Sequence, residues 1–245
     1  MKKFNWLLLA LLFIAVPVLQ SCDNDDNEAF GIDWATVHTT GGGGYYLQGD
    51  NWGKIGIASS NAWFKPIDGE RVIAFFKPLS DKLEGYNIAV QMDGAQSVLT
   101  KKVEDLTAEN DAEYGNDPIV IYEGYMWLGG DYLNLVFKQR IPRTEKHRIS
   151  LVRNVAEPFV EDGYVHLELR YNTYKDTTND WQFSPVSYNL SEFYPKEGED
   201  SNFKGFKVKI NSKENGERTL ILDPKHPVAV PEDAKNAHMS TTTIR

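Results

Sequence analysis

Cys22 is the only cysteine of the 245-residue chain, and it closes an apolar run near the N-terminus. Two lysines at 2–3 come before this run, residues 7–19 form its core, and the small residue Ser21 stands directly before the cysteine. A basic start, an apolar core and a small residue at the cleavage edge are typical of a secretory signal peptide. The core is shorter than the roughly 20 apolar residues that a membrane-spanning helix needs, so we expect a cleaved leader.

The order Leu19-Gln20-Ser21-Cys22 resembles the lipobox of bacterial lipoproteins, although Gln20 replaces the small or aliphatic residue that is usual there. The resemblance implies that residues 1–21 are the signal peptide and that the Cys22 thiol takes a diacylglyceryl group, after which its new amine is acylated. Each buried methylene contributes about 0.8 kcal/mol, so several acyl chains hold a protein on a membrane almost permanently. We therefore expect Cys22 to be the lipid attachment site and a membrane to be one partner.

An acidic segment follows directly, since residues 23–28 read Asp-Asn-Asp-Asp-Asn-Glu without a basic residue. Like-charge repulsion keeps such a segment extended, so we interpret 22–30 as a flexible tether. A calcium loop would need glycine at its sixth position and glutamate at its twelfth, and the segment has neither. Acidic residues after a lipidated cysteine resemble the export signal that sends lipoproteins to the outer membrane and cell surface of some Gram-negative bacteria. The resemblance implies an outer-membrane lipoprotein, with exposure at the cell surface as the further expectation.

No motif in the chain indicates catalysis, which needs a nucleophile with a base, a carboxylate pair in a cleft, or a metal cluster. Once Cys22 is acylated no thiol remains, and neither a Gly-x-Ser-x-Gly elbow nor a phosphate-binding loop is present. The histidines lack a spacing that forces a shared site; they are His38, His147, His166, His226 and His238. We expect no enzyme, no metal and no cofactor. Paired carboxylates such as Glu161-Asp162 leave a hydrolase open as one hypothesis.

The charge of the chain argues against a nucleic-acid partner. The formal net charge is −9, and removal of the leader takes away two of the 26 basic residues and none of the 35 acidic ones, which gives −11. A polyanion would have to be met by a basic stripe. The densest basic group is Lys204, Lys207 and Lys209, which we interpret as the solvated face of a strand. We therefore expect no binding of nucleic acid.

Four aromatic residues near predicted strand ends are the candidate ligand-binding residues: Tyr46, Trp52, Trp63 and Phe64. Trp52 lies in the polar turn Asp-Asn-Trp-Gly at 50–53, an unusual place for a core tryptophan. Small β-barrels present one face and its loops to ligands, often through aromatic rings. The alternative is that these rings cap the core of the barrel, as aromatics near strand ends commonly do.

Five short alternating segments in the first half predict strands separated by turn residues. They are 34–39, 45–47, 54–58, 71–77 and 86–90, and 97–102 extends or pairs with the last one. The four glycines at 41–44 let the chain reverse between the first two strands. Because no amphipathic helix intervenes, we predict a small closed five-stranded barrel of the OB type over 31–108.

Acidic residues without basic or aliphatic neighbours mark 109–117, which we interpret as a linker. Short alternating segments then return, at 119–128, 131–138, 147–152, 164–171, 181–190, 206–210 and 218–222. Gly129-Gly130 and Asn215-Gly216 are hairpin signals. The pattern predicts an immunoglobulin-like antiparallel β-sandwich over 118–223 and an irregular tail at 224–245, which makes the chain all-β.

The order of these features resembles the NigD-like lipoproteins. A lipobox, an acidic tether and a five-stranded unit precede the segment Gly-Tyr-Met-Trp-Leu-Gly-Gly-Asp-Tyr-Leu-Asn-Leu at 124–135, where turn and alternation match the family most specifically. The resemblance covers essentially the whole mature chain and implies an OB domain followed by a β-sandwich. It also implies a role as a bacteriocin-immunity type of lipoprotein, without catalytic or binding residues to carry over.

Three functional hypotheses follow. The first, which we prefer, is a non-catalytic, lipid-anchored interaction protein of the cell envelope or surface that contacts another protein through an apolar and aromatic patch. The second is a glycan-binding accessory lipoprotein that uses exposed aromatics of the OB domain, with Trp52 flanked by Asp50 and Asn51 as the nearest candidate. The third is a hydrolase, which requires buried carboxylates or a histidine that faces a cleft.

Overall fold

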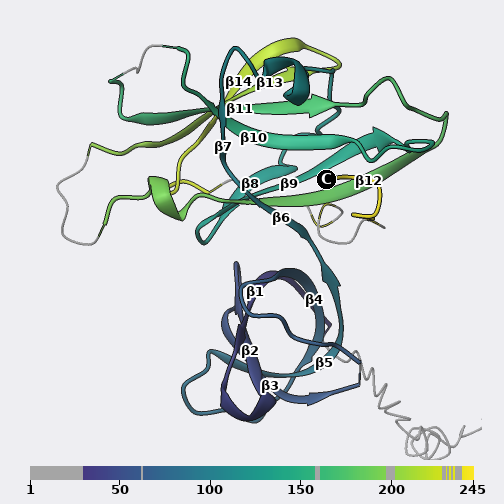
Figure 1. Ribbon diagram of the computed structural model, residues 1–245. Helices are drawn as coiled ribbons and strands as arrows, with labels where there is room; N and C mark the ends of the chain where they lie inside the picture. The colour runs from purple at the N-terminus through teal and green to yellow at the C-terminus, as the bar shows by residue number, and fades with distance from the viewer. Residues whose placement is uncertain are drawn as a thin grey trace, which may run out of the picture.

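The computed structural model describes residues 30–61, 63–157, 161–196 and 202–227 and, in the tail, residues 230, 232, 234 and 239–245. The described chain is all-β, as predicted, with a barrel below and two further sheets above in Figure 1. The predicted signal peptide, the lipid attachment site Cys22 and the acidic segment lie outside the described residues.

The barrel is closed by five strands in the spatial order β1-β2-β3-β5-β4. Their bounds are β1 Gly31–Thr39, β2 Tyr45–Gly49, β3 Gly53–Ser60, β4 Arg71–Pro78 and β5 Ile88–Ser97. Closure comes from the antiparallel pairing of β1 with β4 and the parallel pairing of β3 with β5. Alternation places one set of side chains inside, and these include Val37, Leu47, Ile55, Phe76 and Met92. The prediction of a small five-stranded barrel of the OB type is confirmed.

The glycine run between β1 and β2 forms a short 3-10 turn, η1 Gly41–Gly43. Gly42 and Gly43 have φ angles of 77° and 83°, which side chains with a Cβ rarely adopt. The run therefore reverses the chain, as expected from its composition.

The chain leaves the barrel at Val98, because the next two strands belong to the upper sheets (Figure 1). β6 Leu99–Lys102 pairs in parallel with β12, and β7 Glu104–Leu106 pairs in parallel with β10. This differs from the predicted barrel range of 31–108 and from the predicted linker at 109–117. The stretch 109–117 instead contains the single-turn helix α1 Asp111–Tyr114, whose Tyr114 is buried beneath the sandwich edge.

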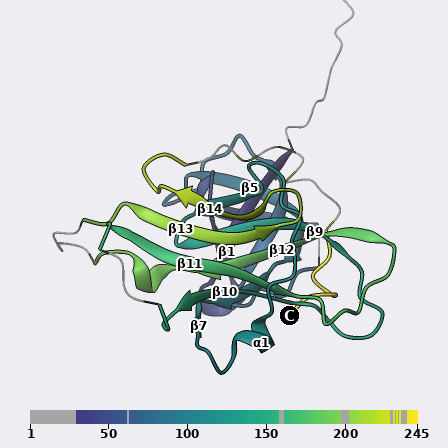
Figure 2. The same ribbon diagram turned by 90° about the horizontal axis from the view of Figure 1, so that it is seen from above.

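The sandwich has a five-stranded sheet in the order β14-β13-β11-β10-β7, which Figure 2 shows from above, and a four-stranded sheet in the order β6-β12-β9-β8. The remaining bounds are β8 Met126–Gly129, β9 Tyr132–Arg140, β10 Arg148–Asn154, β11 Tyr164–Asn172, β12 Trp181–Asn189, η2 Ser191–Phe193, β13 Gly205–Ser212 and β14 Gly216–Leu222. Three of its pairings are parallel: β7 with β10, β11 with β13 and β6 with β12. A β-sandwich is present as predicted, but its sheets are mixed and not purely antiparallel.

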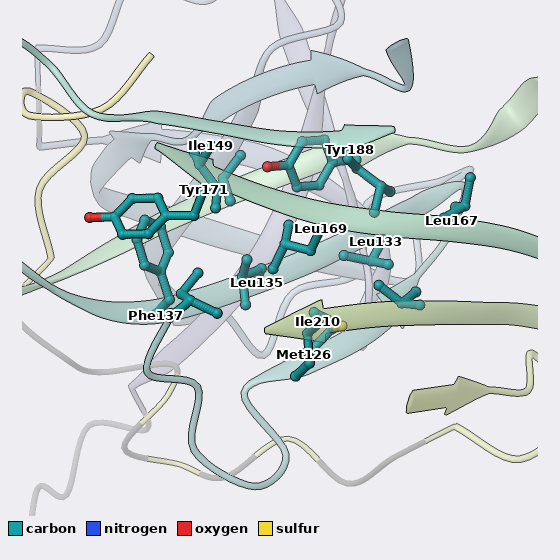
Figure 3. Close-up of a cluster of buried hydrophobic side chains, with 14 of the residues drawn as sticks. Met126, Leu133, Leu135, Phe137, Ile149, Leu167, Leu169, Tyr171, Tyr188 and Ile210 are labelled. Atoms are coloured by element: carbon teal, nitrogen blue, oxygen red, sulfur yellow. The ribbon is translucent and has the colours of Figure 1, made fainter. Parts of the chain in front are cut away.

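The sandwich core lies between these two sheets and takes alternate residues from each strand. Figure 3 shows Leu133, Leu135 and Phe137 of β9 facing Leu169 and Tyr171 of β11. The rings of Phe137 and Tyr171 meet edge to face with centroids 5.6 Å apart. Two of the alternate residues of β9, Asn134 and Val136, are also buried although they face away from this core, which shows that something else covers this part of the outer face of the sheet.

The predicted strand at 119–128 is replaced by two isolated bridges and the short strand β8. Ile119 bridges Ser212 in one sheet, and Val120 bridges Lys138 in the other, so this segment crosses between the sheets. The hairpin between β8 and β9 turns at Gly130 and Asp131, one residue later than the predicted glycine pair, because Gly129 already pairs with Tyr132.

The described part of the tail has no strand, but it packs against both units. Met239 bridges Phe183 of β12, and its carbonyl accepts a 3.0 Å hydrogen bond from Gln96 of the barrel. Ile244 bridges His147, and both Ile244 and Ala234 are buried. The tail thus contributes to the core although its backbone is irregular.

Candidate binding surface

The sandwich covers the outer wall of β1 and β4, so this wall is not available to bind a ligand. Trp34 and Ile73 of the barrel pack against Trp127 and Val136 of the sandwich. The indoles of Trp34 and Trp127 meet edge to face with centroids 4.9 Å apart. This contact explains why Asn134 and Val136, which face away from the sandwich core, are buried.

A buried ion pair lies beside these tryptophans. Arg71 on β4 donates two hydrogen bonds to Asp50, of 2.9 Å to Oδ1 and 2.7 Å to Oδ2, and the two side chains are 1% and 5% exposed. Arg71 Nη2 also donates to Oδ1 of Asn134 on β9 at 3.0 Å, and Asn134 Nδ2 donates back to Asp50 at 2.9 Å. Ser187 Oγ donates to the same Asn134 oxygen at 2.7 Å. The barrel and the sandwich therefore share one hydrogen-bond network.

Trp52 is 39% exposed and stands edge-on to Phe76 of the barrel core, with centroids 5.5 Å apart. Its neighbours are engaged elsewhere, since Asp50 pairs with Arg71 and the Asn51 side chain donates to Asp33 at 2.7 Å. The Trp52 backbone N–H donates to Asp33 as well, at 3.0 Å. Burial raises the pKa of Asp33, although the hydrogen bonds from Asn51 and Trp52 act to lower it. The polar groups expected to flank a glycan at Trp52 thus hold the turn together instead.

Tyr46 lies on the outer face of β2, since its neighbour Leu47 points into the barrel core. It stacks on His38 of β1 with centroids 4.9 Å apart, and Tyr86 approaches it edge-on at 6.0 Å. The Lys54 ammonium lies 4.7 Å from the centres of both tyrosine rings. Tyr46 is therefore half-buried within its own cluster.

Trp63 and Phe64 come from the β3–β4 loop, residues 61–70, of which residue 62 is outside the described part. Phe64 packs on Tyr45, with centroids 5.6 Å apart, and caps the barrel core. Trp63 is 95% exposed, and Ile67 in the same loop is 58% exposed. The base of the loop is fixed, because Asp68 Oδ1 accepts the Thr39 N–H at 2.8 Å. The loop thus exposes the Trp63 indole, while the hydrogen bond of Asp68 fixes the base of the loop.

The four predicted ligand-binding residues do not form one site. Trp52 and Trp63 flank opposite ends of β3, while Tyr46 lies on the wall between them and Phe64 faces inward. Only Trp63 is freely exposed. The structure therefore places these four candidates at separate positions on the barrel.

A hollow of about 620 Å³ lies on the sandwich, and it is lined by residues that include His166, Glu168, Lys207 and Lys209. His166 Nε2 lies 3.1 Å from Asp162, and Lys207 donates to the same carboxylate at 2.5 Å. This ammonium holds the pKa of Asp162 well below its usual range. Within the described residues, no side-chain hydroxyl group hydrogen-bonds to His166.

Lys101 and Ser150 form the other pair that resembles a catalytic arrangement. Lys101 Nζ donates to Ser150 Oγ and to the Ile149 carbonyl, both at 2.9 Å, and burial lowers the pKa of Lys101. Ser150 is fully buried, so its hydroxyl is not open to a substrate. The pair closes the edge of the sandwich.

Two further histidines, His147 and His226, have structural partners. His147 is fully buried, with Nδ1 2.7 Å from the Tyr171 hydroxyl and Nε2 2.8 Å from the Asp176 carbonyl. His226 pairs with Asp223 at 2.7 Å, and His238 lies outside the described residues. In the described part of the chain, no three His, Cys, Asp or Glu side chains are placed to hold a metal ion. No described helix is long and apolar enough to cross a membrane.

Trp181 is an exposed aromatic residue that was not among the predicted candidates. Trp181, at the start of β12, is 39% exposed and is surrounded by Lys138, Arg140 and Lys213. The alternation of Lys138 and Arg140 in β9 is visible in the sequence. The sequence does not show that Lys213 approaches Trp181 from the other sheet, because this approach depends on the crossing segment at 119–120.

Comparison with known proteins places this fold. Residues 102–223 match the family model of the NigD-like C-terminal beta sandwich domain. No curated protein matches the chain. A protein of unknown function from Bacteroides vulgatus ATCC 8482 is 28% identical with a TM-score of 0.72, and the match covers 80% of this chain and 90% of that one. A "toxin related" protein from Parabacteroides distasonis ATCC 8503 is 29% identical with a TM-score of 0.65, covering 85% and 96%.

A NigD-like immunity protein from Bacteroides caccae ATCC 43185 shares the fold at 20% identity, with a TM-score of 0.57 and coverage of 78% and 91%. The matched range begins within β6 and ends just after β14, so it contains almost the whole sandwich that the sheets define. The resemblance inferred from the sequence is thereby confirmed. Residues 102–223 therefore form a NigD-like C-terminal beta sandwich domain.

Proposed function

We propose that this protein is a lipid-anchored, non-catalytic interaction protein of the bacterial cell envelope that binds another protein through the β3–β4 loop of its barrel. The observation that carries the proposal is Trp63, which is 95% exposed at the end of the barrel on a loop with a fixed base. OB barrels commonly present their loops to ligands. Tryptophan is enriched among the residues that dominate binding at protein interfaces.

The energetics favour a partner for this side chain. An indole buries about 150–250 Å² when covered. At about 25 cal/mol per Å², this contributes about 4–6 kcal/mol before the costs of association. Ile67 adds a second apolar group, while Phe64 stays in the core and keeps the loop in place.

The anchor rests on Leu19 to Cys22, and the outer membrane is the proposed location because of the acidic residues that follow. A Bacteroides fragilis NCTC 9343 protein that is named a lipoprotein has a solved structure with the same fold. An immunity role, as the name of the Bacteroides caccae protein states for that protein, would require direct contact with a toxin protein. A protein-binding loop on an anchored barrel fits that requirement.

Two arrangements support the absence of catalysis. His166 with Asp162 faces the hollow without a nucleophile among the described residues, and the Lys101–Ser150 pair is buried. Neither provides the nucleophile, base and open substrate position that hydrolysis needs together.

The experiment is photo-crosslinking in intact cells with benzoylphenylalanine in place of Trp63. The matched control carries the same group in place of Ile221, which is 57% exposed on β14 of the sandwich. We expect a discrete adduct with one protein from position 63 and none from position 221. Adducts of equal yield at both positions, or none at 63, would reject the loop as the binding element.

The anchor is tested separately with Cys22→Ala. We expect the wild-type protein to stay with the outer membrane and its N-terminal peptide to carry acyl mass, and the variant to lose both. A Cys22→Ala protein that still sediments with membranes would reject lipid anchoring without affecting the test of the loop.

A further inference from the structure

We propose that the outer face of the four-stranded sheet, around the start of β12, is a binding site for an acidic polysaccharide. The site consists of Trp181 and three cations, Lys138, Arg140 and Lys213, which we call the cationic patch. It lies on the sandwich and is independent of the barrel loop to which the proposed function assigns a protein partner.

The three cations converge on one indole. Lys213 Nζ lies 4.7 Å, Arg140 Cζ 5.2 Å and Lys138 Nζ 5.6 Å from the centre of the Trp181 ring. Lys138 and Arg140 come from β9, which pairs with β12 beside them in Figure 1. Lys213 follows β13 in the opposite sheet. Cations within about 6 Å of an indole are attracted by the ring, so the arrangement holds their positions.

The crossing segment explains how Lys213 reaches this face. The backbone N–H of Lys213 donates to the Ile119 carbonyl at 2.9 Å, and that of Lys138 donates to the Val120 carbonyl at 2.9 Å. Two consecutive carbonyls therefore hold two cationic residues from different sheets next to each other. This backbone arrangement fixes the patch.

The patch is not neutralised. None of the three cations has a carboxylate within 4.0 Å among the described residues, whereas Arg71, Arg148, Arg153, Arg170 and Arg245 each have at least one. Lys207 also lies over an aromatic ring, that of Tyr164, but it is paired with Asp162. An unpaired positive cluster in a chain of net charge −9 is what an anionic ligand would require.

Aromatic rings extend the patch and favour a sugar chain. Phe183 lies 5.9 Å from Lys138 Nζ and 5.9 Å from the ring of Tyr122, which is 40% exposed. Lys138 thus lies near both Trp181 and Phe183, and Tyr122 contacts Phe183 in turn. Neither the hollow beside His166 nor a second one, lined by residues between 79 and 89, includes these side chains, and what this face offers is flat rings and cations. Sugar rings have flat apolar faces with charged groups at their edges, which suits this arrangement.

The overall charge also bears on the ligand. A net charge of −9 repels a dense polyanion, and DNA carries one charge per roughly 1.7 Å of its axis. An acidic polysaccharide with spaced carboxylates can place them on the patch and keep the rest of its chain away from the acidic surface. Nucleic acid and acidic peptide are therefore alternatives for the test to distinguish.

The test is a titration of the full-length protein in detergent with an oligogalacturonate, in parallel with a neutral maltooligosaccharide, polyglutamate and a single-stranded oligonucleotide. The variants are Lys138→Gln with Arg140→Gln, and Trp181→Ala. The matched control, Lys146→Gln with Lys225→Gln, makes the same change in net charge at exposed lysines outside the patch.

We expect binding of the oligogalacturonate only, weakened about tenfold or more by the double patch variant and by Trp181→Ala, and changed less than about twofold by the control. Equal binding of polyglutamate or the oligonucleotide would overturn the polysaccharide in favour of that ligand class. An unchanged affinity in Trp181→Ala would overturn the role of the indole, and equal losses in the patch and control variants would show general charge attraction only.

Discussion

Arg71 in the barrel donates a 3.0 Å hydrogen bond to Asn134 in the sandwich, while its guanidinium is held by Asp50 of the barrel itself. The ion pair therefore forms within the barrel, and its arginine also donates a hydrogen bond to the sandwich. Since the same face buries Trp34 against Trp127, the two units are joined by a packed and hydrogen-bonded interface.

Arg71→Ala is expected to lower the free energy of unfolding by about 3–5 kcal/mol, because it leaves the Asp50 carboxylate buried without its counter-charge. The measurement is urea denaturation at neutral pH. The control is Arg153→Ala, which breaks the exposed pair with Asp105 and should cost no more than about 1 kcal/mol. Equal losses in the two variants would mean that the buried pair is not important for stability.

Gly129→Ala is expected to destabilise the protein by about 1–3 kcal/mol through crowding of the same network. A Cβ at Gly129 would overlap the Asp50 carboxylate and come within 2.7 Å of Asn134 Nδ2. Gly41→Ala is the matched control, since a Cβ there meets nothing within 4 Å. Thermal unfolding of both variants would show a drop for Gly129→Ala alone; an unchanged midpoint for that variant would contradict the packing described for this turn.

We expect Asp176 to make part of the free energy of unfolding depend on pH in the acid range. Its carboxylate accepts backbone N–H groups of Glu145 and Thr144, and these hydrogen bonds lower its pKa below the usual value. A depressed carboxyl pKa contributes stability that is present above the unfolded pKa of about 4 and is lost as the pH falls toward the folded pKa.

The free energy of unfolding of Asp176→Asn should therefore differ from that of the wild type more at neutral pH than at about pH 3. At about pH 3 the carboxyl group is already protonated in the unfolded state, so the stability that it contributes to the native state is declining. Denaturant unfolding at the two pH values measures this difference. A gap between variant and wild type that does not narrow on acidification would show that the carboxylate charge is not what these N–H groups stabilise.

The barrel was predictable from local sequence because its strands alternate and its turns carry glycine or aspartate. The point at which the chain leaves the barrel was not predictable, because β6 and β7 are short and pair with strands far along the chain, β12 and β10. Alternation alone cannot distinguish a strand that extends β5 from one that starts a different sheet. The acidic composition at 109–117 reflects an exposed helical turn at the sandwich edge and not a domain boundary.

The aromatic candidates were only partly predictable for a similar reason. Trp52 in a polar turn indicates exposure, but its flanking Asp50 and Asn51 are engaged by Arg71 and Asp33, partners that are distant in sequence. The specific segment at 124–135 has a physical role that the sequence does not reveal. It supplies Trp127, Gly129 and Asn134 to the contact with the barrel.

The most direct test of the proposed function is the affinity of the full-length protein for the partner identified by crosslinking at position 63. We predict that Trp63→Ala weakens binding by about 2 kcal/mol or more, roughly 30-fold, as expected for a tryptophan that dominates an interface. Its free energy of unfolding should stay within about 0.5 kcal/mol of the wild type, because the side chain is exposed. Trp181→Ala should bind the partner as the wild type does. An unchanged affinity in Trp63→Ala, with the fold intact, would contradict the proposal.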